Sequence, residues 1–251
     1  MELSFSGLTS AEHWGPWLYL GCVVFVAGIV RGLTGFGFSA LCFFALAPVL
    51  SPLAIVPLMF ALESAASLHL LRRVWVDVPR RWLAFLLVGS AIGIPVGVWL
   101  LSYWSADQVR SITGVVVLVA CLLLLSGIQL IRKPNDIILA IVGLLAGIAN
   151  GMASIGGLVV AVYSLSARLA LVQMRAGLIV FFLVIDVYGL LWFSGHGLLS
   201  IELLYLFAFS LPLMMLGNRF GFSFFDKTSE NFKRYLAIGL LMALAVMAIF
   251  T

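Results

Sequence analysis

Charged side chains are scarce in this sequence. Only 10% of the 251 residues are Asp, Glu, Lys or Arg, whereas 64% are hydrophobic. A soluble domain is usually about one quarter charged, so the composition excludes an ordinary soluble protein. The apolar runs are long and do not alternate with polar residues, which indicates membrane-spanning helices rather than a barrel. The lipid bilayer is therefore an expected partner.

Cysteine is also rare, since only Cys22, Cys42 and Cys121 are present and all three lie in apolar runs. That placement predicts neither a disulfide framework nor a metal site, and no cofactor is expected. The chain lacks a Gly-x4-Gly-Lys-Ser/Thr motif, which argues against nucleotide hydrolysis. The net charge of +4 comes from basic residues in short loops. Such loops are typical of the cytoplasmic face of a membrane protein, so no nucleic-acid partner is expected.

What the sequence does contain is a repeated glycine-rich interruption of an apolar run. Residues 27–37 align without a gap on residues 146–156, at an offset of 119. Glycine allows a backbone to break and to approach another group closely. Two copies of a broken membrane helix are typical of a transporter built from repeats. The identical positions in the first copy are Ala27, Gly28, Ile29, Gly32 and Gly37.

The lengths of the apolar runs predict the spans. The runs 17–30 and 36–50 have about 15 residues each, too few for a comfortable span of roughly 20. They are expected to form one broken segment, and 137–167 a second. Full spans are expected at 53–71, 82–102, 108–131, 175–194, 200–217 and 235–250.

The basic residues predict the orientation of these spans. Twelve of the fourteen Lys and Arg residues lie in four links, which the positive-inside rule places in the cytoplasm. The segment 137–167 then begins and ends inside, and 17–50 begins and ends outside. Both chain termini are expected outside. The alternative is that each broken run crosses as one long tilted helix, which gives eight spans.

The predicted fold is therefore an all-α integral membrane protein with two inverted-topology repeats. Each repeat is a broken or re-entrant helical hairpin followed by three transmembrane helices. The predicted divisions of this single membrane domain are an external segment 1–16, a first repeat 17–131, a cytoplasmic linker 132–136 and a second repeat 137–251. The sequence leaves a homodimer open.

The two glycine-rich tips are the predicted binding site for a small anion. The second limb of each hairpin would begin there, and a helix N-terminus offers unpaired N–H groups and a partial positive charge. The alternative is that these glycines only allow helices to pack closely. The predicted substrate-binding residues are Arg31, Gly32, Thr34, Gly35, Gly37, Ser39, Asn150, Gly151, Ser154, Gly156 and Gly157.

Arg31 is the most distinctive of these residues because it lies inside an apolar run. A charge at mid-membrane costs about 2.5–3.5 kcal/mol on insertion scales, so it needs a partner or an aqueous cavity. A guanidinium can bind an oxyanion through two hydrogen bonds. Its counterpart in the repeat is Asn150, which is also polar. The alternative is that Arg31 lies near the outer surface and reaches water there.

Glu63 and Asp186 form a second repeat-related pair, each in the first full crossing after its hairpin. Buried acids in transporters often relay protons or bind cations, so both are predicted to couple transport to an ion gradient. The alternative is a structural ion pair or hydrogen bond, for example with Arg31.

The two glycine clusters resemble those of the sulfite exporter TauE/SafE family of membrane permeases. The resemblance rests on residues 28–37 followed by Pro48, on residues 147–157, and on the length and number of apolar runs. It implies an exporter or permease for sulfite, sulfonates or related anions in a bacterial cytoplasmic membrane.

The predicted function is thus a secondary transporter of a small anion, sulfite or an organosulfonate, by alternating access around the paired tips, and not an enzyme. A passive anion channel would use the same half-helix dipoles and is the main alternative. A membrane-embedded protease using Glu63 and Asp186 is a weaker one, because the second acid lies in Leu-Val-Ile-Asp rather than in a Gly-x-Gly-Asp run.

Overall fold

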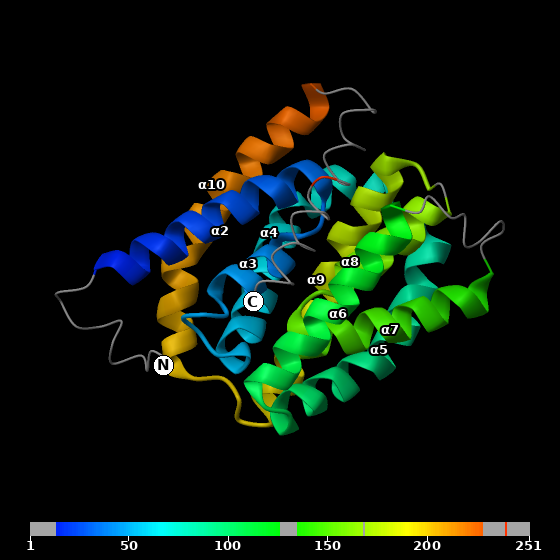
Figure 1. Ribbon diagram of the computed structural model, residues 1–251. Coiled ribbons are helices and arrows are strands. Elements are labelled where there is room, and N and C mark those ends of the chain that lie inside the picture. Colours follow the sequence, from blue (N-terminus) through cyan, green and yellow to red (C-terminus); the bar gives the residue numbers. More distant parts are fainter. Residues whose placement is uncertain (1–13, 126–134, 168, 228–238, 240–251) are drawn as a thin grey trace.

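The computed structural model describes residues 14–125, 135–167, 169–227 and 239, and Figure 1 shows helices joined by short links. The described ranges contain no strand, which confirms the all-helical prediction. The expected span 235–250 lies outside these residues, apart from 239, as do most of the segments 1–16 and 132–136. The helices are α2 (Trp14–Thr34), α3 (Phe38–Leu46), α4 (Pro52–Val74), α5 (Arg80–Tyr103), α6 (Ala106–Leu125), α7 (Asp136–Ala153), α8 (Gly156–Ser166), α9 (Leu171–Gly195) and α10 (Ile201–Lys227), with a 3-10 turn η1 (Trp75–Asp77) after α4.

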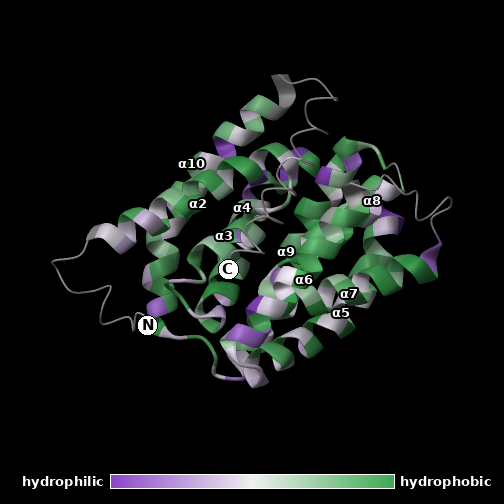
Figure 2. Cartoon of the chain, viewed as in Figure 1, coloured by the Kyte–Doolittle hydropathy of each residue, from purple (hydrophilic) through white to green (hydrophobic). Residues whose placement is uncertain are grey.

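Six helices of the described chain are long and apolar enough to cross a membrane. Hydrophobic residues run along their lengths in Figure 2. This matches the predicted multi-pass membrane protein. The six candidate spans are Gly15–Thr34, Pro52–Asp77, Arg80–Tyr103, Asp136–Ala153, Leu171–Gly195 and Ile201–Phe224.

Two helices, α2 and α10, extend furthest beyond the predicted bounds. The run 17–30 was expected to be too short to cross, but α2 has 21 residues because the helix continues through Arg31 to Thr34. The run 200–217 was expected to end near Gly217, whereas α10 continues to Lys227. Gly217 lies within α10 and packs against the backbone of α2, where a larger residue would clash.

The break between α2 and α3 is made by backbone conformations that favour glycine. Gly35 and Gly37 have φ values of 83° and 87°, in the left-handed region. The Thr34 hydroxyl donates to the Val30 carbonyl at 2.9 Å and lies 2.8 Å from the Phe36 carbonyl. This side chain therefore ties the end of α2 to the chain that follows it.

The break between α7 and α8 lies at the matching position of the repeat. Ser154 takes the place of Gly35 at the 119-residue offset and has a φ of 57°, the one positive φ outside glycine in the described chain. Its backbone N–H donates to the Asn150 carbonyl at 2.7 Å. The prediction of two broken helices is confirmed, and whether either pair is re-entrant stays a prediction.

Two close helix pairs flank the centre of the molecule. Figure 1 shows α2 beside α10 and α5 beside α7, with α4 and α9 between the pairs. Glycines line both contacts, and a Cβ on them would meet the backbone of the facing helix. Small residues allow membrane helices to approach this closely. These glycines are Gly28 and Gly32 facing Gly217 and Gly221, and Gly89, Gly93 and Gly97 facing Gly143, Gly147 and Gly151.

Candidate functional site

Arg31 lies in the last turn of α2 and is buried, with 1% of its surface exposed. Its Nη1 atom lies 3.1 Å from Glu63 Oε1, and Nη2 donates to the Ser67 hydroxyl and to the Glu63 carbonyl. The guanidinium also lies over the Phe182 ring, with Cζ 5.3 Å from the ring centroid. Arg31 is therefore held by α4 and α9 rather than directed to a surface, which rules out the alternative of a surface-reaching side chain.

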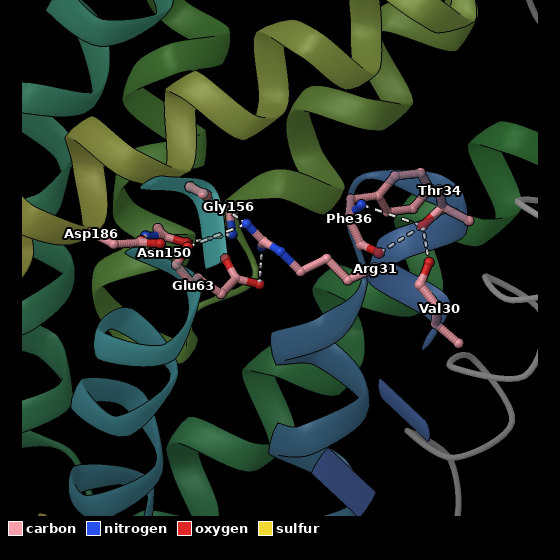
Figure 3. Close-up of polar contacts among 9 residues, drawn as sticks. Val30, Arg31, Thr34, Phe36, Glu63, Asn150, Gly156 and Asp186 are labelled. Atoms are coloured by element: carbon pink, nitrogen blue, oxygen red, sulfur yellow. Dashed lines mark hydrogen bonds and ion pairs between the residues drawn. The ribbon is translucent and has the colours of Figure 1, made fainter. Parts of the chain in front are cut away.

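Asn150 holds the corresponding position in the second broken helix. Its Nδ2 atom donates to Asp186 Oδ1 at 2.8 Å. Its Oδ1 atom accepts a hydrogen bond from the backbone N–H of Gly156, the first residue of α8, at 3.2 Å. Figure 3 shows Asn150 between Asp186 and the start of α8. This amide therefore links the break in α7–α8 to the acid on α9.

The two acids meet at the centre of the molecule. Glu63 on α4 and Asp186 on α9 are both fully buried, and they lie close enough for their charges to repel each other. Figure 3 shows the Arg31 guanidinium reaching the same place from the other side. Arg31, Glu63, Asn150 and Asp186 are called the polar centre below.

The polar centre holds one fixed positive charge and two carboxyl groups. Ser39 in the first turn of α3 lies beside the Glu63 carboxyl, and Cys42 of the same helix lies close enough for the Glu63 charge to act on its thiol. If both acids are ionised, the centre carries a net negative charge away from water, which is costly. One added proton would balance it.

The remaining predicted residues lie either in helix packing or at one of the two breaks. Gly32 and Gly151 face the backbones of α10 and α5, so the structure places them in helix packing. Gly35, Gly37 and Thr34 form the first break. Gly156 and Gly157 open α8, where a Cβ would meet Asn150 and the Phe182 ring respectively.

Ser154 differs from the other residues of the breaks. Its hydroxyl is buried, with 1% of the residue exposed, and it has no hydrogen-bond partner among the described residues. A buried hydroxyl without a partner is unfavourable and is suited to bind a ligand atom. Ser154 therefore remains a candidate contact for an anion.

Sequence reasoning missed three residues of the site. Ser67 lies one helical turn after Glu63, so the i, i+4 spacing could have revealed it. Arg175 was counted among the basic residues of the cytoplasmic links, as a topology signal or a residue that could attract an anion, but it lies in the second turn of α9 and donates to the Gly32 carbonyl. Phe182 gave no signal in the sequence, because nothing distinguishes it from the other aromatic residues of an apolar helix.

Charged groups buried between paired helix breaks define a class of protein, the membrane transporters that bind solutes where helices are interrupted. The family model of the sulfite exporter TauE/SafE family matches residues 20–248, and the chain belongs to this family. Its members are transporters rather than enzymes, which favours transport over the channel and the protease. A search of curated proteins and a search of solved structures each gave no match.

Proposed function

We propose that this protein is a secondary transporter of a small oxyanion, sulfite or an organosulfonate, which binds to Arg31 in exchange for Glu63. The observation that carries the proposal is the ion pair between Arg31 and Glu63 beside two helix breaks. A carboxylate is itself a planar oxyanion, so Glu63 occupies the position that a substrate anion would take on the guanidinium.

Proton uptake by Glu63 allows the substrate anion to replace this side chain on Arg31. When Glu63 is protonated, its attraction to Arg31 falls and the guanidinium can pair with the substrate. Asp186 lies near enough to Glu63 for their charges to repel, so a proton on either acid relieves that repulsion. On the opposite break, Ser154 supplies a buried hydroxyl that has no partner among the described residues, and Asn150 holds Gly156 at the start of α8. Anion binding would thus accompany proton binding, which couples transport to a proton gradient.

The arrangement of the helices supports two inverted repeats as the framework for alternating access. The first helix of each half packs on a late helix of the other half, α2 on α10 and α7 on α5. Helix α4 of the first half corresponds to α9 of the second, and α5 corresponds to α10. The contact between α4 and α10 therefore matches that between α9 and α5, and α4 also packs on its own counterpart α9. A twofold relation between the halves produces such an exchange of partners.

The helices must move during transport because the polar centre is closed off from solvent. Arg31, Glu63, Asn150 and Asp186 are each at most 1% exposed. An anion can reach Arg31 only after helices around it separate. We place that movement between the two flanking pairs, with α4 and α9 at the interface.

The direct test is transport by the purified protein in proteoliposomes, with radiolabelled sulfite and ethanesulfonate and an imposed pH gradient. We expect Arg31→Ala to abolish transport and Glu63→Gln to remove its dependence on the pH gradient. Arg81→Gln is the matched control, because Arg81 is exposed and pairs with Asp136 at the surface. If Arg31→Ala transports every anion as the control does, the proposed site is wrong.

A further inference from the structure

A cavity of about 380 Å³ lies apart from the polar centre, at the ends of α4, α9 and α10. Its polar groups are two arginines and one acid, Arg73, Arg175 and Asp77. The other lining side chains are apolar and are contributed by Val74, Val172, Ala176 and Phe222. This set of residues is called the vestibule below.

Both guanidinium groups of the vestibule face one aromatic ring. Arg175 Cζ lies 4.0 Å from the centroid of the Phe222 ring, and Arg73 Cζ lies 5.7 Å from it. Stacking on an aromatic ring fixes the plane of a guanidinium, and its positive charge still attracts an anion. Two cations that share one ring repel each other, and an anion between them would relieve that repulsion.

Arg175 connects the vestibule to the first helix break. It is 4% exposed and donates to the Gly32 carbonyl near the end of α2. A Cβ on Gly35 would lie 2.8 Å from its Cγ, so this side chain covers the break itself. Gly32 directly follows Arg31 in the chain. An anion bound at Arg175 would therefore stand beside the segment that carries the central arginine.

The lining also indicates the kind of anion. Two arginines against Asp77 leave one net positive charge, which suits a monovalent anion. The apolar side chains offer a surface for a short carbon chain. A sulfonate with a small alkyl group combines both properties, whereas sulfite has only the charged part.

We propose that the vestibule is an entry site for alkylsulfonates, where Arg73 and Arg175 hold the sulfonate before it passes the first helix break to Arg31. This inference rests on the proposed function and adds a second binding site to it. The positive-inside expectation places the link that carries Arg73 in the cytoplasm. The vestibule would then receive substrate from the cell interior.

The test compares Arg73→Gln with Arg72→Gln, which removes the same charge from the next residue but does not line the cavity. Initial rates of ethanesulfonate transport are measured in oriented vesicles, from each side of the membrane in turn. We expect Arg73→Gln to raise KM about tenfold from the side that bears residue 73, at unchanged Vmax, because one charge-assisted contact is lost. Arg72→Gln should match the wild type.

Two further variants test the sign of the charge and the apolar lining. Asp77→Asn should lower KM from the same side, since it removes a repelling carboxylate. Val172→Ser should raise KM for ethanesulfonate and leave KM for sulfite unchanged.

The outcomes separate the two proposals. Equal KM values for Arg73→Gln and Arg72→Gln in a protein that transports ethanesulfonate would overturn the vestibule and leave the function intact. A wild type that transports neither anion would overturn both. A loss of Vmax in Arg73→Gln from both sides would also exclude an entry site, because it would indicate a role in the transport cycle itself.

Discussion

Asn150 donates a 2.8 Å hydrogen bond to Asp186, which lies 36 residues further along the chain. In the same way Arg31 forms a 3.1 Å ion pair with Glu63, which lies 32 residues further along. Asn150 aligns with Arg31 at the 119-residue offset, so each half brings the polar residue of its broken helix to the acid of its next long helix. The second half keeps this contact with a neutral amide. Within the polar centre, the positive charge of Arg31 is thus shared by the two acids Glu63 and Asp186.

Replacement of Asn150 by alanine is expected to destabilise the protein. The variant leaves Asp186 without its donor and the Gly156 N–H without its acceptor. Each buried group that loses its partner costs about 1–3 kcal/mol, so we expect a loss of about 2–4 kcal/mol. The thermal unfolding midpoint in detergent measures this.

Ser154→Ala is the control for that variant, because its buried hydroxyl has no partner to lose among the described residues. It should unfold at or slightly above the wild-type temperature and yet transport less well if Ser154 contacts the anion. Equal unfolding temperatures for Asn150→Ala and Ser154→Ala would contradict this account.

Loss of Arg31 is expected to be repaired in part by loss of the charge on Glu63. Arg31→Ala leaves two buried carboxyl groups without their cation, and breaking a buried ion pair costs about 3–5 kcal/mol. In Arg31→Ala/Glu63→Gln one of those charges is gone, so the double variant should be more stable than the single one. A double-mutant cycle on unfolding midpoints measures the coupling. Simple additivity would show that the pair does not interact as described.

Transport is expected to depend on pH through the same pair. Protonation of Glu63 releases Arg31 for the anion, so the initial rate should rise as the pH on the substrate side falls. Glu63→Gln mimics the protonated acid and should transport at a rate that changes little with pH. Rates across a pH series in proteoliposomes test this, and a variant with the wild-type profile would assign proton coupling to another group.

The glycines between α5 and α7 are expected to be intolerant of larger side chains. A Cβ on Gly93 would clash with the backbone of α7 at the Leu144 carbonyl, so Gly93→Val must push the helices apart. Gly195→Val is the matched control, since no atom lies within 4 Å of a Cβ there. We expect Gly93→Val to lose the monodisperse peak in size-exclusion chromatography while Gly195→Val keeps it. A normal peak for both would show that the contact is looser than described.

Much of the fold could be predicted because the features that a bilayer requires, long apolar helices and glycines at their breaks, are visible in short stretches of sequence. Long apolar runs predict helices, and the glycine clusters marked both breaks. Gly35 and Gly37 adopt a positive φ at the first break, and Ser154 does so between Gly151 and Gly156 at the second. The pairing of Arg31 with Glu63 was considered as an alternative for the same reason, because a buried charge needs a partner.

The rest depends on contacts between distant segments, which composition does not reveal. Gly217 was expected to lie near the end of a span, but a glycine facing another helix looks the same in sequence as a glycine ending one. The role of Arg175 depends on a contact with Gly32, 143 residues away. A basic residue near a helix start carries no sign of such a partner.

The glycine contacts between α2 and α10 and between α5 and α7 also block the passage of a solute between the helices of each pair. Backbone lies against backbone in both pairs, so neither water nor a lipid tail fits between their helices. Side chains such as Phe60 and Phe193, with ring centroids 5.8 Å apart, fill the region between α4 and α9 instead. Rings can rotate aside where a main chain cannot, so a permeation route through the described helices would open along that central aromatic packing.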